Sequence, residues 1–113
     1  MNIKDTEIFE MHAEFCRMIA SSKRLMIIEL LARKEMSVSK IAQSLGLNQS
    51  NISQHLRVLK SQHIVEPRKE GQTVYYRLTN ASLAKVCADI RSILLEGMEQ
   101  RGRKAKGLIK VRR

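Results

Sequence analysis

Apolar residues recur every three or four positions over roughly the first half of the chain, a spacing that predicts successive amphipathic helices. A first helix is expected over residues 5–19, and a second over residues 23–34 with Ser22 as its N-cap. The apolar stripes should lie at Ile8, Met11, Phe15 and Ile19 in the first helix and at Leu25, Ile28 and Ala32 in the second. The second helix has few polar positions before Arg33, so we expect it at the centre of the core.

Two short helices follow. The third is expected between Ser37, its N-cap, and Gly46, which tolerates the left-handed conformation found just after many helices. Asn48 should cap a fourth helix that runs to Lys60. The buried face of this fourth helix is expected to consist of three apolar residues spaced four and three positions apart, Ile52, Leu56 and Leu59. Two short helices joined by a glycine turn, the second rich in amides on its outer side, form a helix-turn-helix pattern.

The period changes to strict alternation over residues 63–79, which predicts two strands. Glu70 and Gly71 are expected at the turn, and Pro67 suits an edge position, where its missing N–H leaves no ladder bond unmade. A last helix, capped by Asn80, should carry a long apolar stripe at Leu83, Val86, Cys87, Ile90, Leu94 and Met98. The expected fold is therefore mainly α with a small β-hairpin, an α+β arrangement in the order ααααββα.

The net charge of +10 is concentrated in two segments. Residues 33–77 carry eight basic and three acidic side chains, and residues 101–113 carry seven basic and no acidic ones. This distribution favours a polyanionic partner, nucleic acid before membrane. We divide the chain into a DNA-binding and dimerisation domain over residues 1–100 and a basic tail over residues 101–113. The tail is expected to be flexible, either as a solubilising extension or as an arm for the DNA minor groove.

Length and composition exclude several classes of protein. A chain of 113 residues forms one domain, and no apolar run approaches the roughly 18 residues of a membrane span. The polar, acidic N-terminus is not a signal peptide, and two cysteines do not make a disulfide scaffold, so a cytoplasmic location is expected. We find no activated nucleophile, carboxylate pair or glycine-rich phosphate loop. The chain is therefore expected not to be an enzyme and to need no cofactor.

The polar residues of the fourth helix are the types that read base edges in the major groove. Gln pairs with adenine, Arg with guanine, and Ser or Asn hydrogen-bonds to bases or phosphates. The candidate DNA contacts on this helix are Gln49, Ser50, Asn51, Ser53, Gln54 and Arg57. On the hairpin, Arg68, Lys69 and Gln72 are expected to reach the adjacent minor groove or backbone. A merely solvated helix face is the alternative, and the glycine turn and basic hairpin beside it disfavour that alternative.

The stretch LNQSNISQHLRVLK, residues 47–60, followed by IVEPRKEGQTVYYRL, residues 64–78, resembles the winged-helix domain of the ArsR/SmtB family of repressors. The resemblance covers residues 15–93. It implies a winged helix-turn-helix that forms a homodimer through its first and last helices and represses transcription from an inverted-repeat operator in double-stranded DNA. The long stripe of the last helix agrees, because spare apolar surface on a small domain indicates a partner. Packing of that stripe within its own subunit is the alternative.

Two other functions also fit the sequence. A sequence-nonspecific, chromatin-type protein would explain the basic tail and a pI near 10.1, and would bind scrambled DNA with a steep salt dependence. A winged-helix protein-interaction module would keep the fold without binding DNA, and the basic hairpin argues against it.

The resemblance further implies an inducer, a small molecule or a redox change, because family members usually release DNA in response to a metal or to oxidation. The soft-metal site of the family has cysteines at the start of the third helix, where this chain has Ser37 and Ser39. Serine is a hard, neutral ligand, so that site is absent. The zinc site uses Asp and His on the last helix, and the aligned positions here are Asn80, Ser82, Ile93 and Glu96. Because isoleucine cannot bind a metal, neither known metal site is expected.

Cys16, Cys87 and His12 are the remaining sensor candidates, and three interpretations of them stay open. The two thiols could form a reversible disulfide or polysulfide link between the first and last helices. Alternatively, His12, one turn before Cys16, could join both cysteines in a metal site whose fourth ligand we cannot name. In the third interpretation both cysteines are inert core residues.

Overall fold

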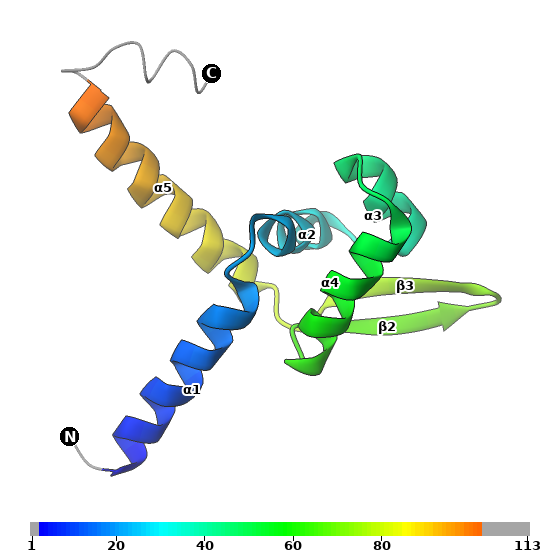
Figure 1. Ribbon diagram of the computed structural model, residues 1–113, viewed down its shortest axis with the longest axis horizontal. Helices are drawn as coiled ribbons and strands as arrows, with labels where there is room; N and C mark the ends of the chain where they lie inside the picture. Colours follow the sequence, from blue (N-terminus) through cyan, green and yellow to red (C-terminus); the bar gives the residue numbers. More distant parts are fainter. Residues whose placement is uncertain (1–2, 103–113) are drawn as a thin grey trace. The chain divides into compact units, whose positions relative to one another are not determined.

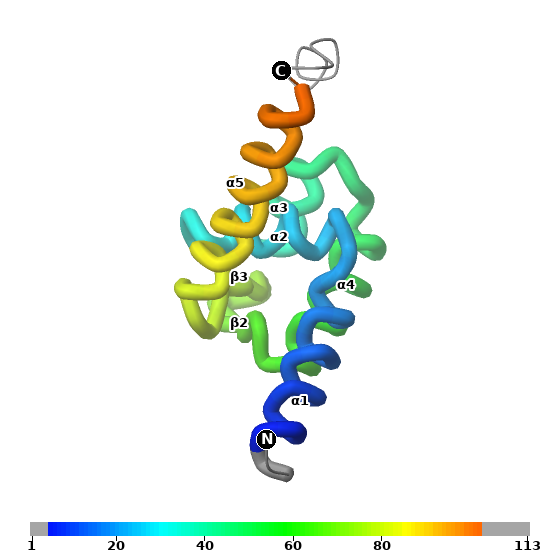
Figure 2. Tube along the Cα trace, turned by 90° about the vertical axis from the view of Figure 1, so that its left-hand side faces the viewer, coloured from blue at the N-terminus to red at the C-terminus, as the bar shows by residue number. Residues whose placement is uncertain are grey.

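The computed structural model describes residues 3–102, with side chains from residue 5. In chain order the elements are α1 (Ile3–Ile19), α2 (Ser22–Arg33), β1 (Met36–Ser37), α3 (Val38–Leu45), α4 (Gln49–Ser61), β2 (Val65–Glu70), β3 (Thr73–Leu78) and α5 (Ser82–Gly102) (Figure 1). Two compact units result, one that ends at Ala81 and one that begins at Ser82; Figure 2 traces the chain through both. The predicted helices and hairpin are confirmed in order, with one strand added. Of the predicted basic tail, all but Arg101 and Gly102 lies outside the described residues.

The core of the first unit is built from α2, α3, α4 and the sheet. Its buried residues are Ile27, Ile28, Leu31, Met36, Ile41, Ala42, Ile52, Leu56, Leu59, Ile64 and Val65. The predicted buried face of α4 is therefore confirmed. In α2 only Ile28 of the predicted stripe is buried, while Leu25 is half-buried and Ala32 is exposed. The N-cap of α2 is Ser21, whose hydroxyl accepts a hydrogen bond from the Arg24 N–H, so the prediction of Ser22 was one residue too late.

The sheet has three antiparallel strands in the order β1-β3-β2, where only a hairpin was predicted. The added strand, β1, pairs Met36 with Tyr76 and Ser37 with Tyr75. β2 is an edge strand, as Pro67 predicts. Glu70 pairs with Thr73, so the turn consists of Gly71 and Gln72 rather than Glu70 and Gly71. Gly71 has φ of 62°, the left-handed value that primed hairpin turns place on glycine.

Both terminal helices carry exposed apolar side chains. On α1 these are Ile8, Phe9 and Met11. On α5 they are Val86, Ile90, Ile93, Leu94 and Leu95, whereas Cys87 is buried. α5 begins at Ser82, two residues after Asn80, the predicted cap. No helix within residues 3–102 is long and apolar enough to cross a membrane.

Candidate nucleic-acid interface

The helix-turn-helix is held by three local hydrogen bonds, each at a residue that the sequence predicted. Ser37 caps α3 by accepting from the Lys40 N–H at 3.1 Å. Gly46, with φ of 67°, ends α3 and donates its N–H to the carbonyl of Ala42. Asn48 then caps α4, its Oδ1 accepting from the Asn51 N–H at 2.7 Å. The turn therefore fixes the start of α4 relative to α3 within three residues.

The outer face of α4 carries polar side chains in a row. Ser50, Gln54 and Arg57 are exposed and are spaced four and three residues apart, which places them on the side opposite the buried Ile52 and Leu56. Gln49 and Ser53, the other exposed candidates, lie beside this row. The structure thus brings five of the six predicted helix contacts to the surface of one helix.

Asn51 differs from its neighbours. Its side chain is half-buried, and its Oδ1 is shielded from solvent with no hydrogen-bond partner within the described part of the chain. A shielded oxygen cannot accept a bond from a base in this position. Of the predicted contacts on α4, Asn51 is therefore the one least suited by its placement.

The hairpin formed by β2, β3 and their turn, which we call the wing, presents Lys69 and Gln72 to solvent. Lys69 lies in β2 next to the tip, and Gln72 is the second residue of the turn. Lys69 is exposed near the end of β2 and Gln72 is exposed in the turn, so a DNA backbone passing the tip would meet an ammonium group and an amide.

Arg68, the third predicted wing contact, is engaged within the protein. Its Nε donates to Glu35 Oε1 at 3.1 Å, a second nitrogen, Nη2, contacts the same carboxylate, and Nη1 donates to Glu70 Oε2 at 2.6 Å. Its guanidinium also lies over the ring of Tyr75, 5.0 Å from the centroid. Hydrogen bonding from Arg68 lowers the pKa of Glu35, and the two carboxylates raise the pKa of Arg68. The sequence did not reveal this cluster, because Glu35 lies 33 positions away.

A second arginine, Arg24, ties α4 to the helices before it. Its Nε donates to His55 Nδ1 at 3.2 Å, and its Nη1 donates to the carbonyl of Met18 at 2.7 Å. One guanidinium thus joins the end of α1, the start of α2 and the middle of α4. The half-buried His55 is thereby hydrogen-bonded to a residue 31 positions earlier in the chain.

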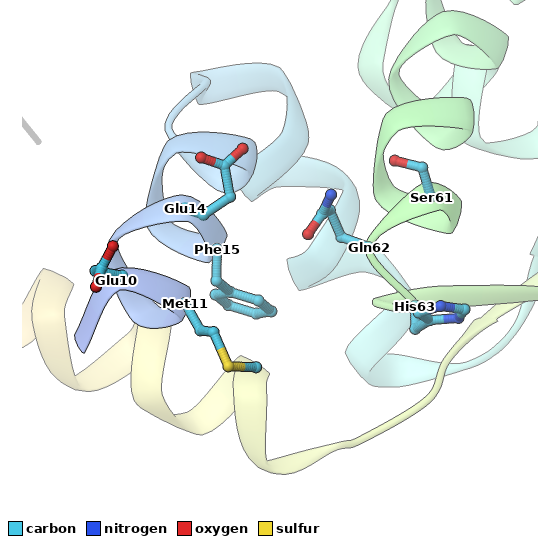
Figure 3. A pocket seen from close by; sticks show the side chains of 7 residues that line it. All are labelled: Glu10, Met11, Glu14, Phe15, Ser61, Gln62 and His63. Atoms are coloured by element: carbon cyan, nitrogen blue, oxygen red, sulfur yellow. The ribbon is translucent and has the colours of Figure 1, made fainter. Parts of the chain in front are cut away.

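A shallow pocket lies between α1 and the C-terminal end of α4 (Figure 3). Met11 and Phe15 of α1 form its apolar part, and Figure 3 shows the Phe15 ring between the two segments. The rest of the lining is polar and consists of Glu10, Glu14, Ser61, Gln62 and His63. None of the predicted DNA contacts lines it, so any occupant would lie apart from the row on α4.

The sensor candidates occupy different environments. Cys16 is exposed on α1, Cys87 is buried in α5, and both are thiols rather than halves of a disulfide. His12 is exposed one turn before Cys16. Among the described residues, no group of three His, Cys, Asp or Glu side chains converges to hold a metal.

Comparison with known proteins identifies the family. The sequence pattern of the family described as bacterial regulatory protein, arsR family, matches residues 21–66, from the N-cap of α2 into β2. Nodulation protein NolR of Rhizobium meliloti is 37% identical over 84 residues, which span 74% of this chain and 69% of NolR. This chain belongs to the ArsR family.

Solved structures agree with this assignment to the ArsR family. The crystal structure of NolR from Sinorhizobium fredii is 35% identical and superposes with a TM-score of 0.73, covering 82% of this chain and 93% of NolR. A homodimeric winged helix-turn-helix DNA-binding domain from Mycobacterium bovis, solved by NMR, is 31% identical with a TM-score of 0.76. The match covers 88% of this chain and 93% of that domain. The predicted winged-helix fold is therefore confirmed, and ArsR-family proteins are transcriptional regulators rather than enzymes.

Proposed function

We propose that this ArsR-family protein is a homodimeric repressor that recognises an inverted-repeat operator in double-stranded DNA. The observation that carries the proposal is the exposed row of Ser50, Gln54 and Arg57 on a helix whose opposite face is buried. A helix placed in the major groove reads bases through such a row. Within the family, the SmtB homolog of Synechocystis, 33% identical, is named a transcriptional repressor.

Each predicted contact has a role that follows from its chemistry. Gln54 would read adenine through its amide, and Arg57 would read guanine or bind phosphate through its guanidinium. Gln49, Ser50 and Ser53 would add bonds to bases or phosphates at the margins of the row. Lys69 and Gln72 on the wing would contact the backbone of the adjacent groove, where they position the protein without reading sequence.

Dimerisation is proposed through α1 and α5. Each helix on its own exposes several large apolar side chains, which is unusual for a chain that remains a monomer. The related Mycobacterium bovis domain is a homodimer. Two copies related by a two-fold axis would present two α4 helices to two half-sites of an inverted repeat.

Operator selection from random double-stranded DNA tests the proposal. The purified full-length chain should enrich an inverted repeat whose two halves are separated by about one helical turn. Gln54→Ala should then reduce discrimination at one position per half-site by about fivefold or more, since each good base contact contributes about 1–3 kcal/mol. Gln43→Ala, an exposed glutamine on α3, is the matched control and should leave discrimination unchanged.

Other outcomes identify the competing functions. Enrichment of no sequence, with tight binding that weakens steeply in salt, would support a nonspecific chromatin-type protein. Absence of binding at low salt would support a protein-interaction module instead. Either result contradicts the proposed operator recognition.

For regulation, we propose that Cys16 is the thiol at which an oxidant acts first and that Cys87 is its partner. Cys16 supports this because it is exposed on a helix with an apolar surface, whereas reaction at the buried Cys87 requires an opening of the structure. Operator affinity should be measured with thiols reduced and oxidised, beside a mass count of remaining thiols. A tenfold fall in operator affinity when both thiols are consumed supports thiol sensing, provided that oxidation has no such effect on Cys16→Ser. Unchanged affinity would show that neither cysteine is a sensor.

A further inference from the structure

Arg68 reaches across the outer face of the three-stranded sheet. It starts on β2, passes over Tyr75 of β3 and ends on Glu35, which directly precedes β1. The register explains this path, since Arg68 and Ser37 both pair with Tyr75, one from each side. One side chain therefore connects both edges of the sheet.

The far end of this connection belongs to the helix-turn-helix. Glu35 is two residues before Ser37, and Ser37 caps α3 through the Lys40 N–H. β1 and the cap of α3 thus share a residue, so anything that holds the wing to Glu35 also holds it to α3. The pairing of β1 with β3 involves only two residue pairs, so the bonds of Arg68 to Glu35 add to a short strand contact.

We propose that Arg68 is a positioning residue of the wing, and that its bonds to Glu35 fix the angle between the wing and the helix-turn-helix. The inference rests on the proposed function, in which α4 and the wing contact one DNA duplex together. If the wing is held before binding, Lys69 and Gln72 lose little conformational freedom on reaching the backbone. Arg68 then acts through the wing instead of contacting phosphate itself.

The geometry distinguishes this cluster from an ordinary surface ion pair. Single exposed pairs contribute little, because solvent and salt screen them. Arg68 is held by three kinds of contact at once: two nitrogens on Glu35, a third on Glu70, and its plane over Tyr75. Its side chain is 42% exposed and that of Glu35 34% exposed, so both are partly covered by the sheet.

The same sheet face supplies a matched control. Glu66 and Arg77 form a cross-strand pair at 2.6 Å between β2 and β3; the charge of Arg77 lowers the pKa of Glu35, but its hydrogen bond goes to Glu66. Glu35→Ala and Glu66→Ala each remove one carboxylate from this face. Simple electrostatics predicts that both changes strengthen DNA binding, because each removes a negative charge near the phosphates. Only a positioning role for Arg68 separates the two variants.

Operator affinity of the full-length chain is therefore measured for both variants and for Arg68→Lys. Glu35→Ala should lower affinity at least threefold, whereas Glu66→Ala should leave it equal or higher. Arg68→Lys keeps the charge but loses the planar fork, and it should behave like Glu35→Ala. Affinity for Glu35→Ala equal to or above that of Glu66→Ala, or full affinity for Arg68→Lys, overturns the proposal.

A second readout does not depend on DNA. NMR order parameters for the amides of Gly71 and Gln72 should fall from near 0.85 toward 0.6 in Glu35→Ala but remain high in Glu66→Ala. A rigid wing in Glu35→Ala contradicts the proposal even if the chain binds no operator. Conversely, a mobile wing in a protein that binds no DNA leaves Arg68 as a positioning residue and removes the proposed function.

Discussion

The bond between Arg24 and His55 sets the protonation state of an imidazole on the candidate recognition helix. His55 accepts from Arg24 through Nδ1, which is available only in the neutral ring. Burial is the largest cause that lowers the pKa of His55, and the charges of Arg24 and Lys23 lower it further. Folding of the protein is therefore linked to the protonation of the His55 imidazole.

The sign of that linkage gives a pH prediction. With a pKa below its ordinary value of 6.5 in the folded protein, His55 favours folding while it is neutral. Its contribution to the free energy of unfolding is present above about pH 6.5 and is lost as the pH falls through the folded pKa. Urea titrations from pH 7 to pH 5 should show falling stability in the wild type.

His55→Asn isolates this contribution from that of the carboxylates. Asparagine places an amide oxygen near the position of Nδ1, so Arg24 keeps an acceptor that does not titrate. The difference in urea midpoint between the two proteins should change between pH 7 and pH 5, in favour of the variant at low pH. A constant difference would show that His55 does not titrate in this range.

The start of α4 shows how one residue can serve both stability and binding. Asn48 Oδ1 accepts from the Asn51 N–H at 2.7 Å and from the Ser50 hydroxyl at 2.9 Å. It therefore satisfies a helix N–H that has no intrahelical partner and also orients a candidate DNA contact. Stability and affinity should respond differently to changes at this position.

Asn48→Ala should lower the free energy of unfolding by about 1 kcal/mol, because α4 loses its N-cap. Asn48→Asp keeps the acceptor and adds a negative charge that the helix N-terminus favours, so stability should be preserved. That same charge would face the DNA phosphates, and operator affinity of Asn48→Asp should fall several-fold. Urea denaturation and a binding titration on the same samples measure both quantities. Unchanged operator affinity in a stable Asn48→Asp would argue against a groove-facing α4.

The elements that sequence predicted best are those fixed by local bonds. The caps Ser37 and Asn48 act on N–H groups three residues away, and Gly46 acts through its own backbone conformation. Ser21 was missed by one position because a second serine follows it, and only the backbone decides between the two. β1 was missed because its two residues are defined by pairing with β3, nearly forty positions later.

The same distinction applies to the candidate interface. The exposure of Gln54 and Arg57 could be predicted, because helical spacing alone separates them from Leu56 and the other buried residues. The partners of Arg68 could not, since Glu35 approaches it only after β1 joins the sheet. Sequence alone predicts that a basic residue in a wing contacts phosphate. Only the fold determines whether a carboxylate of the protein already neutralises its charge.

At the scale of the whole molecule, the apolar surface of α5 requires a partner if the protein is to function as a regulator of palindromic sites. Ile90, Ile93 and Leu94 are 51%, 66% and 60% exposed. They share one face of the helix, since Ile93 and Leu94 follow Ile90 by three and four residues. Burying the exposed part of each such side chain, somewhat more than half of it, would contribute about 1–2 kcal/mol. A two-fold related pair of such faces would gain that contribution twice per residue.

Ile93→Glu should therefore convert the dimer to a monomer, because a carboxylate placed in the apolar contact would be buried without a partner. Ser92→Glu adds the same charge on the opposite side of α5 and should leave the dimer intact. Sedimentation equilibrium at micromolar protein measures the oligomeric state, and circular dichroism checks that both variants fold. Loss of the dimer should lower operator affinity at least a hundredfold, since a monomer engages one half-site and loses the effective concentration supplied by its partner. A folded, dimeric Ile93→Glu would place the interface on another surface, with the exposed apolar residues of α1 as the next candidate.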